Sequence, residues 1–288
     1  MIEDKMENKR LALKVQDDQE MATIEIGTMK KITHVFDANK KSELSQEINY
    51  DATPRVQSYG LLNLTNFERG CKEKHVAFFT MPHYEMNLKE YLSKLNGVNK
   101  IEKVLDVALK LVSIFKYTHC AKRTFNDLKL DNIMIDTQGS MEADPKVYLI
   151  DFGFAQKYVK KDGKEHISDK ERVECFQGNI IFSSERQMAF HKTCRKDDFI
   201  SLFYMLIFML NNKSLWVGGS DPLKGASKME VVFKSIYDWK KQHDLTSIAD
   251  IFSREFTFPL KNEHPDHQKH INTFFQNLGL LADDIQKI

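Results

Sequence analysis

Short runs of alternating hydrophobic and polar residues dominate the first 85 residues and predict a small β-sheet. Residues 10–15, with the sequence RLALKV, have the length and composition of a strand, and so do residues 55–64 and 75–81. The stretch between the last two is rich in turn-forming residues. We therefore expect three strands in this region.

One helix is expected between the first and second of these strands. Asp17 and Asp18 are residue types that cap helices, because a carboxylate accepts hydrogen bonds from the free backbone N–H groups of the first turn. The positions expected to form the buried face of this helix are Met21, Ile24, Thr28 and Ile32. The first 85 residues thus predict a sheet packed with one helix.

From residue 87 onward the hydrophobic positions repeat with the period of a helix. Leu88, Tyr91, Leu92 and Leu95 predict a helix that ends at Asn96-Gly97. A longer helix is expected over residues 101–120. Its apolar stripe consists of Ile101, Val104, Leu105, Ala108, Leu111, Val112 and Phe115.

Three further elements are expected in the rest of the chain. The apolar runs 133–136 and 147–150, joined by the turn-rich sequence TQGSMEADP, predict a hairpin. Residues 198–210 are apolar on all sides, which is typical of a helix buried inside a protein. The strongest apolar run, residues 200–210, is only eleven residues long, whereas spanning a bilayer takes about 20. A last helix is expected around residues 271–279.

The charge composition excludes some classes of function. The 288 residues carry 42 basic and 41 acidic side chains, a formal net charge of +1, which argues against a protein dedicated to nucleic acid or to a membrane surface. The first ten residues are charged throughout, so no secretory signal is expected. The four cysteines are far apart in the sequence, which favours reduced thiols in the cytoplasm or nucleus.

Polar motifs that suit phosphate chemistry flank the predicted hairpin. The sequence FNDLKLDN, residues 125–132, precedes it, and Asp151-Phe152-Gly153 follows it. Each motif alone is common, but the two in this order around one hairpin form a specific combination. They resemble the catalytic loop H-R-D-L-x-x-x-N and the D-F-G motif of eukaryotic protein kinases.

The resemblance implies a role for each matching residue. Asp127 would be the catalytic base that accepts the substrate hydroxyl proton, and Lys129 would lie beside the transferring phosphoryl group. Asn132 and Asp151 would hold Mg²⁺, a hard cation that prefers carboxylate and amide oxygens. A lysine at position 129 favours serine and threonine over tyrosine as phosphate acceptors.

The first predicted strand extends the resemblance to the nucleotide site. Residues 11–14, LALK, are similar to the kinase sequence V-A-I-K, and Glu25 on the following helix would pair with Lys14, in preference to Glu20. The resemblance therefore implies that the cofactors are ATP and Mg²⁺, and that the partner is a protein substrate with serine or threonine hydroxyls.

The adenine base would lie near a small residue of this strand and a connecting segment. Ala12 would contact the base, and the backbone from Met81 to Tyr84 can offer it a carbonyl and an N–H group.

Two later segments narrow the resemblance to the casein kinase I branch, with the vaccinia-related kinases next. GNIIFSS at residues 178–184 and CRKDDFISL at residues 194–202 are similar to the patterns GTARYAS and SRRDDLESL of that branch. Asp198 would then anchor the catalytic loop from the buried helix. The similarity covers roughly residues 10–280.

The implied fold is of the α+β class and has two lobes. A small, truncated β-rich N-lobe would cover residues 1–85, and a larger, mainly helical C-lobe would cover residues 86–288. The N-lobe is expected to lack the glycine-rich loop, because no G-x-G-x-x-G motif precedes Lys14 and the first glycine is Gly27.

Two functions remain open at this level. The first is a serine/threonine kinase of casein kinase I type that transfers the γ-phosphate of Mg·ATP to protein hydroxyls. The second is a pseudokinase that acts as a binding or scaffolding module. The second is favoured by the missing glycines and by Phe125 and Asn126, which stand where the family has His-Arg.

Overall fold

The computed structural model describes residues 2–4, 9–39, 50, 52–64, 74–95, 97–160, 165–168, 170–210 and 228–243. Contacts divide the chain into two compact units, each made of segments that are far apart in the sequence. Unit 1 comprises Met1–Leu92, Lys110–Phe125 and Leu130–Ala155, and unit 2 comprises Ser93–Leu109, Asn126–Lys129 and Gln156–Ile288. The expected α+β class is confirmed, whereas the predicted lobe boundary after residue 85 stays a prediction.

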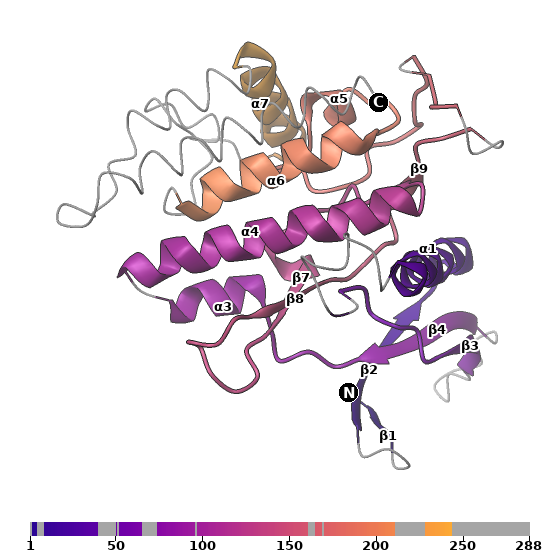
Figure 1. Cartoon of the computed structure of the whole chain (residues 1–288). Coiled ribbons are helices and arrows are strands. Elements are labelled where there is room, and N and C mark those ends of the chain that lie inside the picture. The colour runs from indigo at the N-terminus through magenta and orange to yellow at the C-terminus, as the bar shows by residue number, and fades with distance from the viewer. Residues whose placement is uncertain are drawn as a thin grey trace. The chain divides into compact units, whose positions relative to one another are not determined.

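A four-stranded antiparallel sheet forms one part of unit 1 (Figure 1). Its strands are β1 (Ile2–Asp4), β2 (Lys9–Gln16), β3 (Ser58–Leu64) and β4 (Lys74–Pro82), in the spatial order β1-β2-β4-β3. The three predicted strands are thereby confirmed, and β1 is an addition that the sequence pattern does not predict. The register pairs Ala12 with Met81 and Lys14 with Phe79.

The predicted helix is present as α1 (Gln19–Ala38), and Asp18 caps it, since its carboxylate accepts a hydrogen bond of 2.9 Å from the N–H of Met21. The predicted face is wrong at Ile24, which is 40% exposed. Glu25 is buried instead, because it pairs with Lys14 of the sheet. The buried residues of α1 are Ala22, Glu25, Thr28, Met29, Ile32 and Phe36.

Helices and a second small sheet follow in the middle of the chain. The elements are β5 (Met86–Asn87), α3 (Leu88–Lys94), α4 (Gly97–Cys120), β6 (Arg123–Thr124), the 3₁₀ helix η1 (Leu130–Asn132), β7 (Ile133–Asp136) and β8 (Lys146–Leu149). Both predicted helices are confirmed, although α4 begins at Gly97 and not at residue 101. Glycine is much more common just after a helix than at a helix start, so the sequence pattern indicates an end at Gly97 and misplaces this start.

The predicted hairpin is confirmed by the antiparallel pairing of β7 with β8. Its inward side chains, Ile133, Ile135, Val147 and Leu149, have no exposed surface. Every second residue of each strand is therefore buried, as expected for a sheet with one face toward a core. This hairpin fixes the positions of the residues of unit 1 that flank it, Asn132 and Asp151 among them.

Unit 2 contains β9 (Gln156–Lys157), α5 (Glu185–Met188), α6 (Arg195–Leu210) and α7 (Met229–Gln242). The predicted buried helix is α6, which begins earlier than expected because Asp197 accepts a hydrogen bond of 2.7 Å from the N–H of Cys194 at the helix start. The sequence pattern does not predict α7, in which only Ile236, Trp239 and Lys240 are buried. The predicted helix at residues 271–279 lies outside the described residues.

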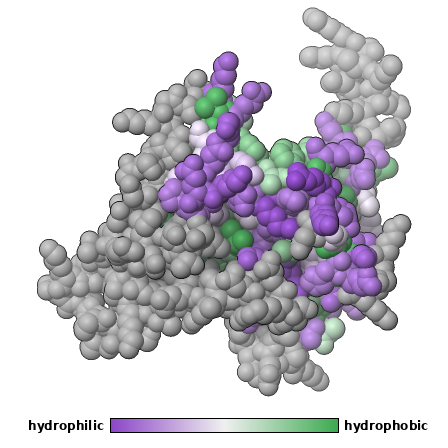
Figure 2. Space-filling view, turned by 90° about the horizontal axis from the view of Figure 1, so that it is seen from above, coloured by the Kyte–Doolittle hydropathy of each residue, from purple (hydrophilic) through white to green (hydrophobic). Residues whose placement is uncertain are grey.

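The face of the described residues that Figure 2 shows agrees with the charged composition. Hydrophilic residues make up most of the coloured surface in Figure 2, and a smaller hydrophobic area lies among them. Within the described ranges, each helix is too short or too polar to cross a bilayer.

Candidate active site

Lys14 lies at the centre of a cluster of charged groups in unit 1. Its ammonium donates hydrogen bonds of 2.9 Å to both carboxylate oxygens of Glu25 and one of 2.7 Å to Oδ1 of Asp151. The sheet presents the lysine, α1 presents the glutamate, and the chain after the hairpin presents the aspartate. The ion pair expected between Lys14 and Glu25 is present, and Glu20 is exposed.

Gln16, two residues after Lys14 and on the same face of β2, supports this cluster. Its Nε2 donates a hydrogen bond of 2.6 Å to Oε2 of Glu25. The sequence analysis does not include Gln16, although its position on the face of Lys14 is the signal that could have identified it.

Burial and the neighbouring charges shift the pKa values of Lys14 and Glu25 in opposite directions. Burial opposes the charge on Lys14, but Glu25 and Asp151 together outweigh it, so the pKa of Lys14 lies above its usual value. Burial raises the pKa of Glu25, and the ammonium of Lys14 offsets part of that rise. The ammonium therefore stays charged near neutral pH and can hold phosphate oxygens.

The two candidate Mg²⁺ ligands flank the paired ends of the hairpin. Ile133 and Leu149 are opposite each other in the register, Asn132 precedes the first, and Asp151 follows the second by two residues. The N–H of Ile150 also donates a hydrogen bond of 2.9 Å to the carbonyl of Asn132. The backbone thus holds an amide and a carboxylate at the same end of one hairpin.

Asp151 has an unusual backbone conformation, with a φ of +67°. Aspartate tolerates the left-handed region better than most residues, and such conformations are concentrated at functional sites. Phe152, which follows it, is fully buried and packs edge-on against Phe125 with a ring-centroid distance of 5.1 Å. The phenylalanines of the two motifs that flank the hairpin thus pack against each other.

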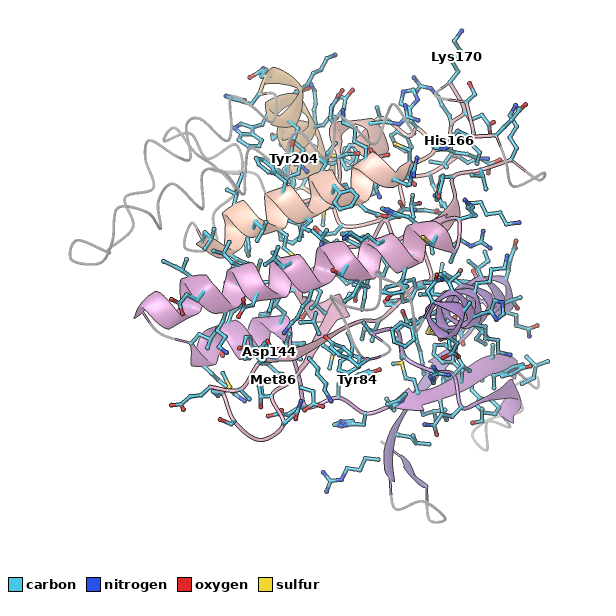
Figure 3. The ribbon with its side chains drawn as sticks, viewed as in Figure 1. Tyr84, Met86, Asp144, His166, Lys170 and Tyr204 are labelled. Atoms are coloured by element: carbon cyan, nitrogen blue, oxygen red, sulfur yellow. The ribbon has the colours of Figure 1, made fainter. Side chains whose placement is uncertain are left out.

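The segment after β4 is held by aromatic and polar contacts. Tyr84, labelled in Figure 3, packs against Tyr148 on β8, with a distance of 4.2 Å between the ring centroids. The carboxylate of Glu85 accepts hydrogen bonds of 2.9 Å from the N–H and 2.8 Å from the hydroxyl of Thr137. These contacts fix the backbone that is expected to face adenine.

Asp127 and Lys129 belong to unit 2, where they form an ion pair of 2.6 Å. The N–H of Asn126 donates a hydrogen bond of 3.0 Å to Oδ1 of Asp198 on α6, as the sequence predicts. Asn126 has a φ of +72°, a conformation that asparagine adopts more readily than most residues. The buried helix thus anchors the loop directly before Asp127.

Gly178 and Gln187 connect the loop that begins at residue 177 to the loop that carries Asn126 and Asp127. Nε2 of Gln187 donates hydrogen bonds of 3.0 Å to the carbonyl of Asn126 and 2.7 Å to that of Gln177. Gly178 has a φ of +132°, and a Cβ there would lie 2.6 Å from the carbonyl oxygen of Asn126. Only glycine fits this close approach. The sequence analysis does not assign a role to either residue.

Replacing Gly178 by alanine is expected to lower the free energy of unfolding by about 2 kcal/mol, since the new Cβ meets backbone and the conformation is strained. The melting temperature should fall by about 2–4 °C per kcal/mol. The matched control is Gly27→Ala in α1, where a Cβ meets nothing within 4 Å and stability should rise by roughly 0.5–1 kcal/mol. Equal changes in the melting temperatures of the two variants would contradict the conclusion that only glycine fits at position 178.

The model of one protein family matches most of the chain. Residues 13–276 match the family model of the protein kinase domain. A casein kinase 1-like protein of Oryza sativa is 29% identical over 112 residues, which cover 39% of this chain and 16% of the relative. A probable casein kinase I homologue of Encephalitozoon cuniculi is 24% identical over 220 residues, which cover 73% of this chain and 65% of the relative.

A third relative extends the same pattern. Casein kinase I homologue 1 of Saccharomyces cerevisiae is 26% identical over 193 residues, which cover 64% of this chain and 35% of the relative. The matched regions therefore span 16–65% of the length of these three relatives.

Proposed function

Because the chain belongs to the protein kinase family, on its casein kinase I branch, we propose that it transfers the γ-phosphate of Mg·ATP to serine and threonine hydroxyls of proteins. The observation that carries this proposal is the position of Lys14, whose ammonium is bonded to Glu25 and Asp151 together. A lysine held in this way is prepared to bind phosphate oxygens without reorganisation.

The residues proposed to bind ATP all belong to unit 1. Ala12 and Met81, paired in the sheet, would contact adenine, and the backbone of Tyr84 would complete the adenine contacts. Lys14 would bind phosphate oxygens, and Glu25 would keep its ammonium in place. The role of a small residue at position 12 is to leave room for a flat base.

Asn132 and Asp151 fit a Mg²⁺ ion, because an amide oxygen and a carboxylate are the donor types that this cation takes. When bound, Mg²⁺ would neutralise the charge on the phosphate oxygens. Asp127 would accept the proton of the substrate hydroxyl as phosphate transfer proceeds, and Lys129 would hold a phosphate oxygen. We place the protein in the cytoplasm or nucleus.

A pseudokinase with a scaffolding role is the second candidate. Phe125 and Asn126 favour it, because they replace the His-Arg pair of the family and asparagine has no guanidinium for a phosphate group. The complete set Lys14, Glu25, Asp127, Asn132 and Asp151 favours the enzyme, because a scaffold has no physical need for all five.

A phosphate-transfer assay distinguishes the two candidates. Purified protein is incubated with γ-labelled Mg·ATP and casein, and the labelled amino acids are identified. We expect label on serine or threonine that is lost with EDTA and lost in Asp151→Asn protein purified in the same way. A folded wild-type protein that transfers no label would contradict the enzyme and favour the scaffold.

A further inference from the structure

Lys240 on α7 is a buried lysine whose ammonium is hydrogen-bonded to a loop of unit 2, residues 180–183. Its residue is 4% exposed, and Nζ donates hydrogen bonds of 2.6 Å to the carbonyl of Ser183, 2.7 Å to that of Ile181 and 3.3 Å to that of Ile180. The ring of Tyr204 on α6, labelled in Figure 3, lies with its centroid 4.5 Å from the same nitrogen. The three protons of an ammonium thus match three backbone acceptors.

A charge in this position has an energetic cost that an apolar side chain would avoid. Burial lowers the pKa of Lys240 well below its usual value. Within the described part of the chain, its polar partners are carbonyl oxygens and an aromatic face rather than a carboxylate. The carbonyls and the ring offset the free-energy cost of burying the charge. The hydrogen bonds to the loop at residues 180–183 therefore explain why a lysine occupies this position.

Asn179, which precedes the same loop, also fixes it through hydrogen bonds. Its Oδ1 accepts hydrogen bonds of 2.9 Å from the N–H of Ile181 and 3.1 Å from that of Phe182. The hydroxyl of Ser183 donates a hydrogen bond of 2.6 Å to the carbonyl of Asn179. Phe182 and Ser183 are buried, whereas Ile180 and Ile181 remain partly exposed, so these two residues are the part of the loop that another molecule can contact.

The loop is also tied to the residue that precedes the proposed catalytic base. Gln187 bridges the carbonyl of Gln177, just before the loop, and the carbonyl of Asn126, just before Asp127. A molecule that contacts Ile180 and Ile181 therefore lies on a loop that is tied to the segment carrying Asp127. A protein substrate bound at this loop would be held close to the proposed catalytic base, which favours a role for the loop in orienting the substrate.

We propose that Lys240 is a positioning residue for protein substrate, which holds residues 180–183 as a fixed platform next to Asp127. The inference rests on the proposed function, because it assumes that a protein chain is the phosphate acceptor. Lys240 does not touch substrate in this account and acts through the backbone that it holds. Its loss should weaken the use of protein substrate and leave the use of ATP unchanged.

The test compares Lys240→Met with Lys241→Met, which removes an exposed lysine from the next position of the same helix. We expect the KM for casein to rise about tenfold in Lys240→Met, with the KM for ATP and the hydrolysis of ATP without casein within about twofold of wild type. Lys241→Met should match wild type in all three. An equal loss of casein phosphorylation and of ATP hydrolysis, or no change in either, would overturn the proposal.

A second variant and a binding measurement keep the test decisive. Asn179→Ala loosens the same loop without altering α7, and it should raise the KM for casein while leaving that for ATP unchanged. Casein affinity, measured by surface plasmon resonance, should fall about tenfold in Lys240→Met. Wild-type protein that binds casein but transfers no phosphate would contradict the proposed function alone. Equal casein affinity in wild type and Lys240→Met, or no casein binding by wild type, would overturn the role of Lys240.

Discussion

Replacing Asp127 by asparagine is expected to lower the kcat for phosphate transfer to casein by about a hundredfold or more. Asparagine has the same size as aspartate but cannot take up the hydroxyl proton, so the substitution removes the base together with the charge that pairs with Lys129. The loop should keep its position, because the N–H of Asn126 remains bonded to Asp198. The KM for ATP should change by no more than about twofold, because the substitution leaves the residues proposed to bind ATP unchanged.

The matched control for this variant is Asp131→Asn, which removes an exposed carboxylate from η1. It should retain at least about half of the wild-type kcat, since exposed substitutions away from reacting atoms have small effects. Initial rates at saturating ATP and casein measure the difference. Activity of Asp127→Asn within about threefold of wild type would show that another group takes the proton.

Replacing Lys14 by methionine is expected to lower kcat/KM for ATP by about a hundredfold and to destabilise the protein. Methionine keeps the length and the apolar stem of lysine but leaves the carboxylate of Glu25, which is 1% exposed, with Gln16 as its remaining hydrogen-bond donor among the described residues. The free energy of unfolding should fall by about 2 kcal/mol, less than for a fully buried pair because Lys14 itself is partly exposed.

The destabilisation should depend on pH in a defined direction. Burial raises the pKa of Glu25 in the folded protein, and removing the ammonium of Lys14 raises it further. The folded variant therefore binds the Glu25 proton more tightly than the unfolded chain does, and it loses stability as pH rises through that folded-state pKa. The melting temperatures of Lys14→Met and wild type should differ more at pH 8 than at pH 5.

A lysine elsewhere on the same unit controls for the loss of one charge. Lys30→Met removes an exposed ammonium that lies over the ring of Tyr59, and it should alter neither nucleotide use nor the pH dependence of melting. Nucleotide affinity and thermal melts at the two pH values separate the variants. A Lys14→Met protein with unchanged ATP affinity would exclude Lys14 from the nucleotide site.

Local patterns in the sequence were sufficient for most elements and for the identity of the motifs. The strand containing Lys14, the helix capped by Asp18 and the hairpin β7–β8 are all visible as periodicity and turn chemistry, because burial of apolar side chains leaves a regular trace in the sequence. The catalytic-loop and D-F-G motifs are visible as fixed spacings. The sequence thus predicts which residues carry the chemistry.

Only the tertiary structure decided how polar residues are buried, because periodicity records apolar positions and gives no sign of a buried charge. Glu25 faces inward in place of Ile24 because Lys14 of the sheet meets it. Lys14 also bonds to Asp151, which is 137 residues away, and Lys240 holds a loop about 60 residues earlier in the chain. The resemblance implied the pair of Lys14 with Glu25, but the contacts of Lys14 with Asp151 and of Lys240 with its loop depend on folding that brings distant segments together, so no local pattern could have predicted these two.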